Sequence, residues 1–182
     1  MRRLITVLLA LVAVTALAAC GNKEDRVLHG ATEGIYLDLG ALKYQVQISR
    51  LLNPTDTEDS AYFEGVGAGE TRLGRGETWF GVFIRVINDG KRGATAADDF
   101  EIEDTQGHTF RPVSMAATNP FAYRPARVGP GGSLPVPGSI ADEGPIGGGL
   151  ILFKLTDETL GNRPLELRIR GDRAEGTVAL DV

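Results

Sequence analysis

The sequence contains only one cysteine, Cys20, and only two histidines, His29 and His108. One cysteine excludes an intramolecular disulfide and a metal site built from several thiolates, so folding must depend on the hydrophobic core. The histidines show no HxxxH spacing, and zinc or copper sites are therefore not expected. No serine lies in a GxSxG elbow, so we expect no enzyme, although a hydrolase assembled from distant segments stays an alternative.

Long apolar runs are also scarce, and the clearest one extends from Leu4 to Ala19, directly after the basic residues Arg2 and Arg3. A basic start before an apolar run that is short for a membrane span is typical of a secretory signal. The run closes with Leu17-Ala18-Ala19-Cys20, which resembles the lipobox of bacterial lipoproteins. The resemblance implies that the Cys20 thiol carries a diacylglycerol, that the preceding peptide bond is cut, and that Cys20 becomes the mature N-terminus.

Cleavage before Cys20 would leave 163 of the 182 residues. Without Arg2 and Arg3, the chain keeps 17 basic against 24 acidic residues, a formal net charge of −7. A domain with this negative charge has no general attraction for nucleic acid or for an anionic membrane surface. The two acyl chains of the diacylglycerol on Cys20 must therefore provide the anchoring. We expect an exported protein held by this lipid at the extracytoplasmic face of the cell membrane, with no other cofactor and no nucleic-acid partner.

The 24 glycines and nine prolines indicate many turns and no long helix. We expect a signal peptide at 1–19, a lipidated cysteine and flexible spacer at 20–32, and one domain at 33–182. Alternating or continuous apolar residues predict strands at 34–39, 42–48, 78–88, 98–104, 149–155, 165–170 and 178–182. Such a series predicts an immunoglobulin-like antiparallel β-sandwich of about seven to nine strands.

The strand at 78–88 is apolar on both faces and is expected at the centre of a sheet, with Trp79 filling the space between the sheets. The segment 55–77 is expected to be a flexible connection, in which Ala61-Tyr62-Phe63 forms an edge strand or a docking point.

The order of features from Tyr44 to Ile169 resembles a family of exported bacterial immunoglobulin-like domains of unknown function, many of them lipoproteins. The matching features are Asn88 and Gly90 after the central strand, Phe100-x-Ile102-x-Asp104-x-x-Gly107, Val128-Gly129-Pro130-Gly131-Gly132-Ser133, Phe153, and Leu165-x-Leu167-x-Ile169. The proline-rich insert at 111–149 departs from the pattern. The resemblance implies a non-catalytic binding or scaffolding role at the cell envelope, for an unknown envelope protein or ligand.

The insert holds the candidate protein-binding residues Phe121, Tyr123, Arg124 and Arg127. Aromatic residues and arginines are enriched at binding hot spots, and long loops on β scaffolds often carry function. The alternative is that Phe121 and Tyr123 pin the loop to the sandwich, while the two arginines pair with the acidic surface.

A calcium or small-ligand site is the other functional alternative, with Asp99, Glu101 and Glu103 as weak candidate ligands. These carboxylates alternate with the apolar residues Phe100 and Ile102, so they share one face of a predicted hairpin. Calcium prefers several carboxylate oxygens, but acidic residues on one strand face are also common as solvated edge residues.

Overall fold

The computed structural model describes residues 27–67, 69–172 and 174–181. The predicted signal peptide at 1–19 and the lipobox cysteine Cys20 lie outside the described residues. Within the described ranges, no helix is long and apolar enough to cross a membrane.

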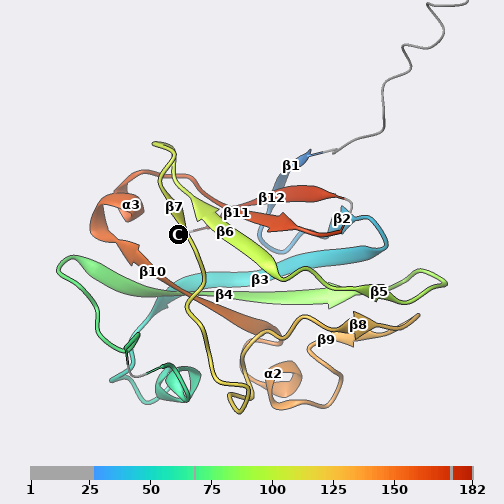
Figure 1. The fold of residues 1–182 in the computed structure, drawn as a ribbon, viewed down its shortest axis with the longest axis horizontal. Helices are drawn as coiled ribbons and strands as arrows, with labels where there is room; N and C mark the ends of the chain where they lie inside the picture. The colour runs from blue at the N-terminus through green and yellow to red at the C-terminus, as the bar shows by residue number, and fades with distance from the viewer. Residues whose placement is uncertain (1–26, 68, 173, 182) are drawn as a thin grey trace, which may run out of the picture.

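Two sheets pack face to face, which confirms the predicted β-sandwich (Figure 1). The first sheet has the order β1 (Val27–Thr32), β12 (Glu175–Leu180), β11 (Leu165–Arg170), β6 (Asp99–Glu103), β7 (Thr109–Phe110). The second has the order β10 (Gly149–Thr156), β4 (Glu77–Ile87), β3 (Leu42–Leu52), β2 (Leu37–Leu39), with β9 (Ser133–Leu134) also on β4. A separate pair joins β5 (Ala94–Thr95) to β8 (Arg127–Val128), and the helices are η2 (Ser60–Phe63), α2 (Ile140–Glu143) and α3 (Asp157–Gly161).

The pairing is antiparallel throughout these strands except between β1 and β12, which run parallel. This strand corrects the predicted spacer at 20–32, because residues 27–32 belong to the sandwich. The polar composition of 21–32 suggested a solvated linker, whereas the backbone of β1 completes its hydrogen bonds on the edge of β12.

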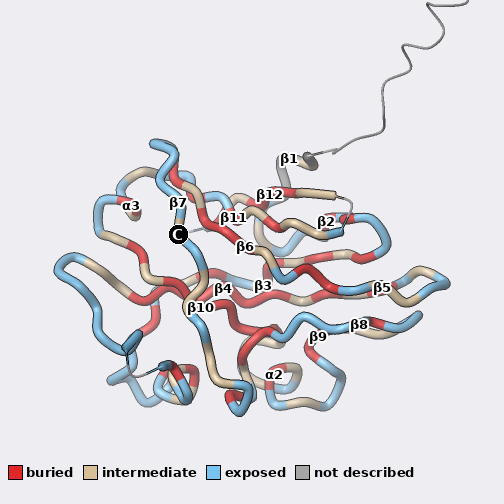
Figure 2. The backbone as a smooth tube through the Cα atoms, in the orientation of Figure 1, coloured by how far each residue is buried: buried red, intermediate tan, exposed pale blue. Residues whose placement is uncertain are grey.

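Alternate residues of β4 fill the space between the sheets. Phe80, Val82 and Ile84 are fully buried there and belong to one apolar cluster with Leu167 and Ile169 from β11. Burying one such side chain contributes about 1.5–3 kcal/mol, so this layer is a large part of the folding free energy. Figure 2 shows the buried segments concentrated along the strands of both sheets.

A second apolar cluster covers the outer face of the β10–β4–β3 sheet. Trp79, Phe83 and Leu152 lie on that face, and Tyr62 and Val66 from the 53–66 segment cover them. The prediction that Trp79 fills the space between the sheets is therefore wrong, because its neighbour Phe80 points into that space and Trp79 points to the outer face. The central position of β4 is confirmed, since both of its faces are buried.

The 55–77 segment is consequently more than a flexible connection. Tyr62 is buried, and its ring meets Phe83 edge-on at 5.1 Å between centroids. Residues 61–63 thus form a docking point, as one alternative predicted, but they fold as the 3-10 helix η2 and not as a strand.

A β-bulge between Val46 and Ile48 reverses the faces of β3. Before the bulge, Tyr44 and Val46 point into the inter-sheet core; after it, Leu52 joins the outer cluster and Ile48 is exposed. A bulge adds one residue to one strand and so shifts the two-residue period. This shift is what allows a single strand to support both apolar layers.

Candidate functional site

The start of the 111–149 insert runs along the outer edge of β10 and closes it. The Val113 amide donates to the Leu152 carbonyl at 2.7 Å, and the Leu150 amide donates to the Phe121 carbonyl at 2.7 Å. The Tyr123 amide donates back to the Leu150 carbonyl at 2.8 Å. An open strand edge would expose unpaired backbone groups, and the insert satisfies them.

Asn119 ties this insert to the other long loop. Its side-chain amide donates to the carbonyls of Tyr62 at 3.0 Å and Glu64 at 2.8 Å, and its Oδ1 accepts from the amides of Phe121 and Ala122. Asn119 is 3% exposed, so these bonds are shielded from water. Its role was missed from the sequence, although an asparagine before a proline is a signal for a turn.

Phe121 and Tyr123 point into the protein, which confirms that they pin the insert to the sandwich. The Phe121 ring meets Tyr62 edge-on at 4.9 Å between centroids. Tyr123 is 9% exposed, and its ring meets Phe100 edge-on at 5.2 Å. Aromatic pairs of this geometry contribute about 0.5–1.5 kcal/mol beyond their buried area.

The Tyr123 hydroxyl is a hydrogen-bond donor and not an acid. Burial raises the pKa of Tyr123 far above its ordinary value of 10.0, and the nearby Tyr44 and Asp98 add to the rise. The neutral hydroxyl donates to the Ala97 carbonyl at 2.8 Å. Gly149 makes this placement possible, because a Cβ there would lie 3.0 Å from the Tyr123 Cα.

Neither candidate arginine forms an ion pair with a carboxylate in the part of the chain that the structure describes, so the expected pairing with the acidic surface is wrong for both. Arg124 donates to the Met115 carbonyl at 3.2 Å and also to the Ala116 carbonyl, so it braces the insert from within. Arg127 lies on β8, where its guanidinium packs over Gly93. The four candidate residues therefore do not form one exposed patch.

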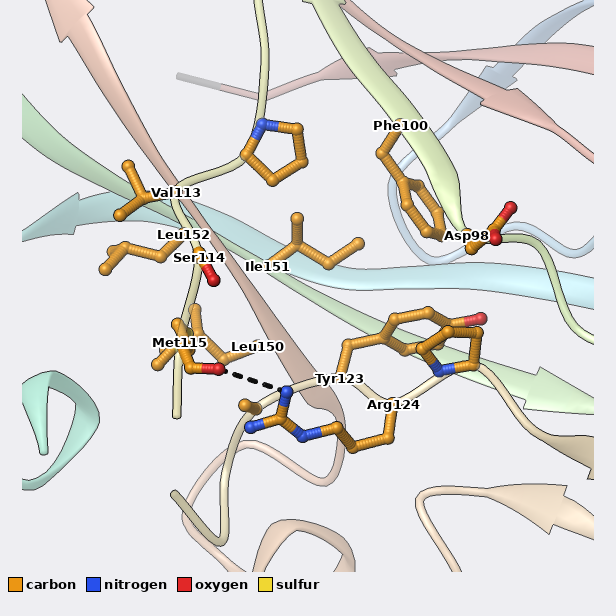
Figure 3. Close-up of a pocket in the computed structure, with 13 residues that line it drawn as sticks. Asp98, Phe100, Val113, Ser114, Met115, Tyr123, Arg124, Leu150, Ile151 and Leu152 are labelled. Atoms are coloured by element: carbon orange, nitrogen blue, oxygen red, sulfur yellow. Dashed lines mark hydrogen bonds between the residues drawn. The ribbon is translucent and has the colours of Figure 1, made fainter. Parts of the chain in front are cut away.

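Tyr123 and Arg124 instead form part of a pocket of about 240 Å³ at the β10 edge of the sandwich. Figure 3 shows Arg124 extended beneath the Tyr123 ring toward the Met115 carbonyl, with Ser114 beyond it and Asp98 on the opposite side. The remaining labelled lining is apolar, with Phe100, Val113, Leu150, Ile151 and Leu152. An apolar pocket with a few polar groups at its margin is the usual form of a small-ligand site.

A second pocket of about 170 Å³ lies against the same two residues. Leu134, Pro135 and Val136 line it, and Val136 is 61% exposed. Tyr123 and Arg124 thus contribute to two adjacent hollows. A large exposed apolar side chain at the margin of a hollow is a common feature of binding surfaces.

The acidic face of β6 is neither a solvated edge nor a free set of metal ligands. The strand lies between β7 and β11, and Glu101 is 6% exposed. Glu101 accepts from Arg168 and Arg170 at 3.1 Å each and pairs with Arg111 at 3.0 Å.

The flanking carboxylates are paired in the same way. Asp99 pairs with Arg111 and Arg170, and Glu103 pairs with Arg168. Positive charge already stands where calcium would bind, and no group of three or more acidic, histidine or cysteine side chains in the described ranges is placed to hold a metal ion. We therefore make no calcium proposal for Asp99, Glu101 and Glu103.

His108 pairs with Asp104, with 2.9 Å between Nδ1 and Oδ2. Such a pair could orient a catalytic imidazole, but the hydrogen bonds that the described residues give His108 include none to a serine. Asp104 also accepts from the amides of Gln106 and His108 and from Asn162. The pair thus holds the turn after β6.

Neither a protein-family model nor a curated protein sequence matches the chain. Solved structures match its fold. The yjhA protein from Bacillus subtilis is 11% identical with a TM-score of 0.55, covering 84% of this chain and 100% of that one. The secreted protein MPT63 from Mycobacterium tuberculosis is 17% identical with a TM-score of 0.53, covering 85% and 98%. At these identities the likeness establishes the β-sandwich fold alone.

Proposed function

We propose that this protein is a lipid-anchored, non-catalytic binding module of the cell envelope. In this proposal an envelope protein or ligand places an apolar group, with a polar group beside it, in the pocket at Tyr123 and Arg124. The observation that carries the proposal is the pocket itself. The insert that departs from the family pattern is fixed to β10 and supplies one wall of that pocket, together with Asp98 from the β5–β6 link.

Rigidity of the pocket walls supports a binding role. Asn119 and Tyr123 tie the insert to neighbouring backbone segments, and Arg124 bonds to a carbonyl within the insert. Little conformational entropy therefore remains to be lost when a ligand enters. The pocket volume of about 240 Å³ suits one side chain or a small ring. The partner would therefore contribute one anchoring group, and not an extended strand.

Cys20 supports the anchoring part of the proposal, through the sequence of Leu17–Cys20 alone. The secreted MPT63 provides an example of this fold outside the cytoplasm. Changing Cys20→Ser should leave the precursor uncut at this site and without the added mass of a diacylglycerol, which mass spectrometry of the intact protein measures. A wild-type chain that carries no lipid mass on Cys20, or a Cys20→Ser chain that is still cut before residue 20, would contradict the anchor.

The pocket is tested by cross-linking on membranes from cells that express the full chain. Ser114 lines the pocket, is exposed and makes no hydrogen bond with the described residues, so Ser114→Trp should fill the pocket without disturbing the fold. Thr118→Trp, at an exposed position of the same loop but outside the pocket lining, is the matched control. We expect a cross-linked partner with wild type and Thr118→Trp and none with Ser114→Trp. Equal capture by both variants, or none by wild type, would contradict the pocket.

A further inference from the structure

A pocket of about 510 Å³ lies at the end of the sandwich that carries β5 and β8. Its lining comes from three places, which are the β2–β3 turn with the start of β3, β5 and the residues before it together with β8, and the β11–β12 turn. They supply Gly40 and Tyr44, then Arg92, Thr95 and Arg127, and finally Asp172. Figure 1 shows the β5 and β8 arms projecting together at that end of the molecule.

Among the described residues of this lining, Arg92 and Arg127 are cationic, and both are exposed. Neither makes an ion pair within residues 27–67, 69–172 and 174–181. Arg85, Arg168 and Arg170, by contrast, are each paired with a carboxylate. Two arginines without an ion-pair partner at one pocket are therefore available to bind an anion.

Asn88 joins the backbone segment at Arg92, just before β5, to the backbone of β8, which carries Arg127. It is fully buried, and its side-chain amide donates to the Arg92 carbonyl at 2.9 Å and to the Val128 carbonyl at 2.8 Å. Val128 directly follows Arg127 on β8. The arginine-bearing backbones are therefore set before any ligand arrives, which lowers the entropic cost of binding.

Further bonds join Asn88 to the glycine-rich stretch at 128–133. The backbone amide of Asn88 donates to the Gly132 carbonyl at 2.9 Å, and its backbone carbonyl accepts from the Gly131 amide at 2.8 Å. Its Oδ1 also accepts from the Gly90 amide at 3.0 Å. The Asn88–Gly90 signature and the 128–133 signature, which lie about 40 residues apart in the sequence, thus form one structural unit at this pocket.

Gly93 fixes the path of the Arg127 side chain. A Cβ at Gly93 would lie 3.1 Å from the Arg127 Nε, 3.2 Å from one Nη and 3.3 Å from Cζ. These distances place the Arg127 guanidinium against Gly93, so a side chain at position 93 would crowd it. The glycine thus leaves room for the guanidinium at the margin of the pocket, where its planar donors can meet an oxyanion.

We propose that Arg92 and Arg127 form an oxyanion-binding site that takes a phosphate or carboxylate group. The planar guanidinium presents donors in a fork that matches both groups. Asp172 also lines the pocket, and the two arginines outnumber it among the described lining residues, which favours an anion. This site is independent of the pocket at Tyr123 and Arg124, and its failure would not affect that proposal.

The test is a titration of the full chain in neutral detergent micelles, followed by amide NMR shifts of residues 92–95 and 127–128. Inorganic phosphate and acetate are the soluble probes, and micelles containing phosphatidylglycerol test whether a lipid headgroup is the source of the phosphate. We expect saturating shifts with at least one of these probes. Arg92→Gln with Arg127→Gln should raise the Kd at least tenfold, or about 1.4 kcal/mol.

Arg72→Gln with Arg75→Gln is the matched control, because it removes the same charge from exposed positions outside this pocket. That control should leave the Kd within twofold of the wild type. Asp172→Asn should lower the Kd, since it removes the opposing charge. The proposal is overturned if no probe gives saturating shifts, or if the Arg92 and Arg127 variant binds as tightly as the control.

Discussion

The Tyr123 hydroxyl donates to the carbonyl of Ala97 at 2.8 Å. The amide of Ala97 in turn donates to the Tyr44 hydroxyl oxygen at 2.7 Å. Ala97 is buried, so both bonds are shielded from water. One peptide segment between β5 and β6 is thereby fixed from two sides, by β3 and by the insert.

Tyr123→Phe should lower the free energy of unfolding by about 1–3 kcal/mol, because the Ala97 carbonyl would lose a buried donor. The ring would stay in place against Phe100. Urea unfolding followed by fluorescence measures the change. Tyr36→Phe is the control, since Tyr36 is 45% exposed and the change should cost less than about 0.5 kcal/mol. Equal stability of the two variants would show that the Tyr123 bond contributes nothing.

The Asp104–His108 pair should make stability depend on pH. The hydrogen bond to Asp104, together with the charge of that carboxylate, raises the pKa of His108 above its ordinary value of 6.5. The stabilisation is fully present below pH 6.5 and is lost as the pH rises through the folded-state pKa. The stability difference between wild type and His108→Gln should therefore shrink as the pH rises above 6.5 and through the raised pKa of His108.

Urea unfolding at a series of pH values measures this difference. Asp104→Asn should return the NMR-measured pKa of His108 to about 6.5, because the negative partner is gone. A difference between wild type and His108→Gln that stays constant with pH would contradict the pairing.

The inner layer of the sandwich was predictable from local sequence because β4 repeats with period two. Phe80, Val82 and Ile84 are inward as that period requires. What covers the outer face was not predictable, because Phe83 contacts Tyr62 and Trp79 contacts Phe63, and both partners come from a loop without a periodic pattern. Apolar residues on both faces indicated burial, but the sequence contains no local signal of which segment provides it.

The sequence indicated which segment contains the candidate binding residues, but it did not indicate which of their side chains reach the surface. Residue type identified Tyr123 and Arg124, but the inward direction of the tyrosine depends on Gly149, which lies 26 residues later. The partners of Glu101 were hidden for the same reason, since Arg168 reaches it from another strand 67 residues away. Single-sequence patterns report neighbours along one strand, whereas these contacts are set by strand order.

Glu101 should be important for stability because three arginines converge on its carboxylate. Glu101→Gln should lower the free energy of unfolding by about 2 kcal/mol, within the range for hydrogen bonds to charged groups. The partial exposure of Arg168 and Arg170 keeps the loss below that of a fully buried pair. Thermal and urea unfolding measure the change, and Glu166→Gln on the exposed side of β11 is the control.

A double-mutant cycle measures the interaction free energy between Glu101 and Arg170. Combining Glu101→Gln with Arg170→Met should cost less than the sum of the two single changes, because each removes the other's partner. Strict additivity would mean that this ion pair contributes no net free energy.

Gly81 lies at the middle of β4, where the outer cluster leaves no room for a side chain. A Cβ at this position would lie 2.6 Å from Leu52 Cδ1 and 3.0 Å from Leu150 Cδ1. Gly81→Ala should therefore destabilise the protein by about 1–3 kcal/mol through overpacking, which urea unfolding measures. Gly161→Ala is the control, because no heavy atom lies within 4 Å of the added Cβ.

If the cost of Gly81→Ala comes from steric crowding, shortening the crowded neighbour Leu52 should reduce it. A cost that comes only from lost backbone flexibility would not change. Leu52→Ala alone should destabilise the protein by about 2–5 kcal/mol, because it leaves a cavity in the outer cluster. When Leu52→Ala is combined with Gly81→Ala, the methyl group added on β4 enters the space that the leucine vacated. The combined loss should then be at least about 0.5 kcal/mol smaller than the sum. If the two losses simply add, the clash with Leu52 is not the reason that β4 carries a glycine at this position.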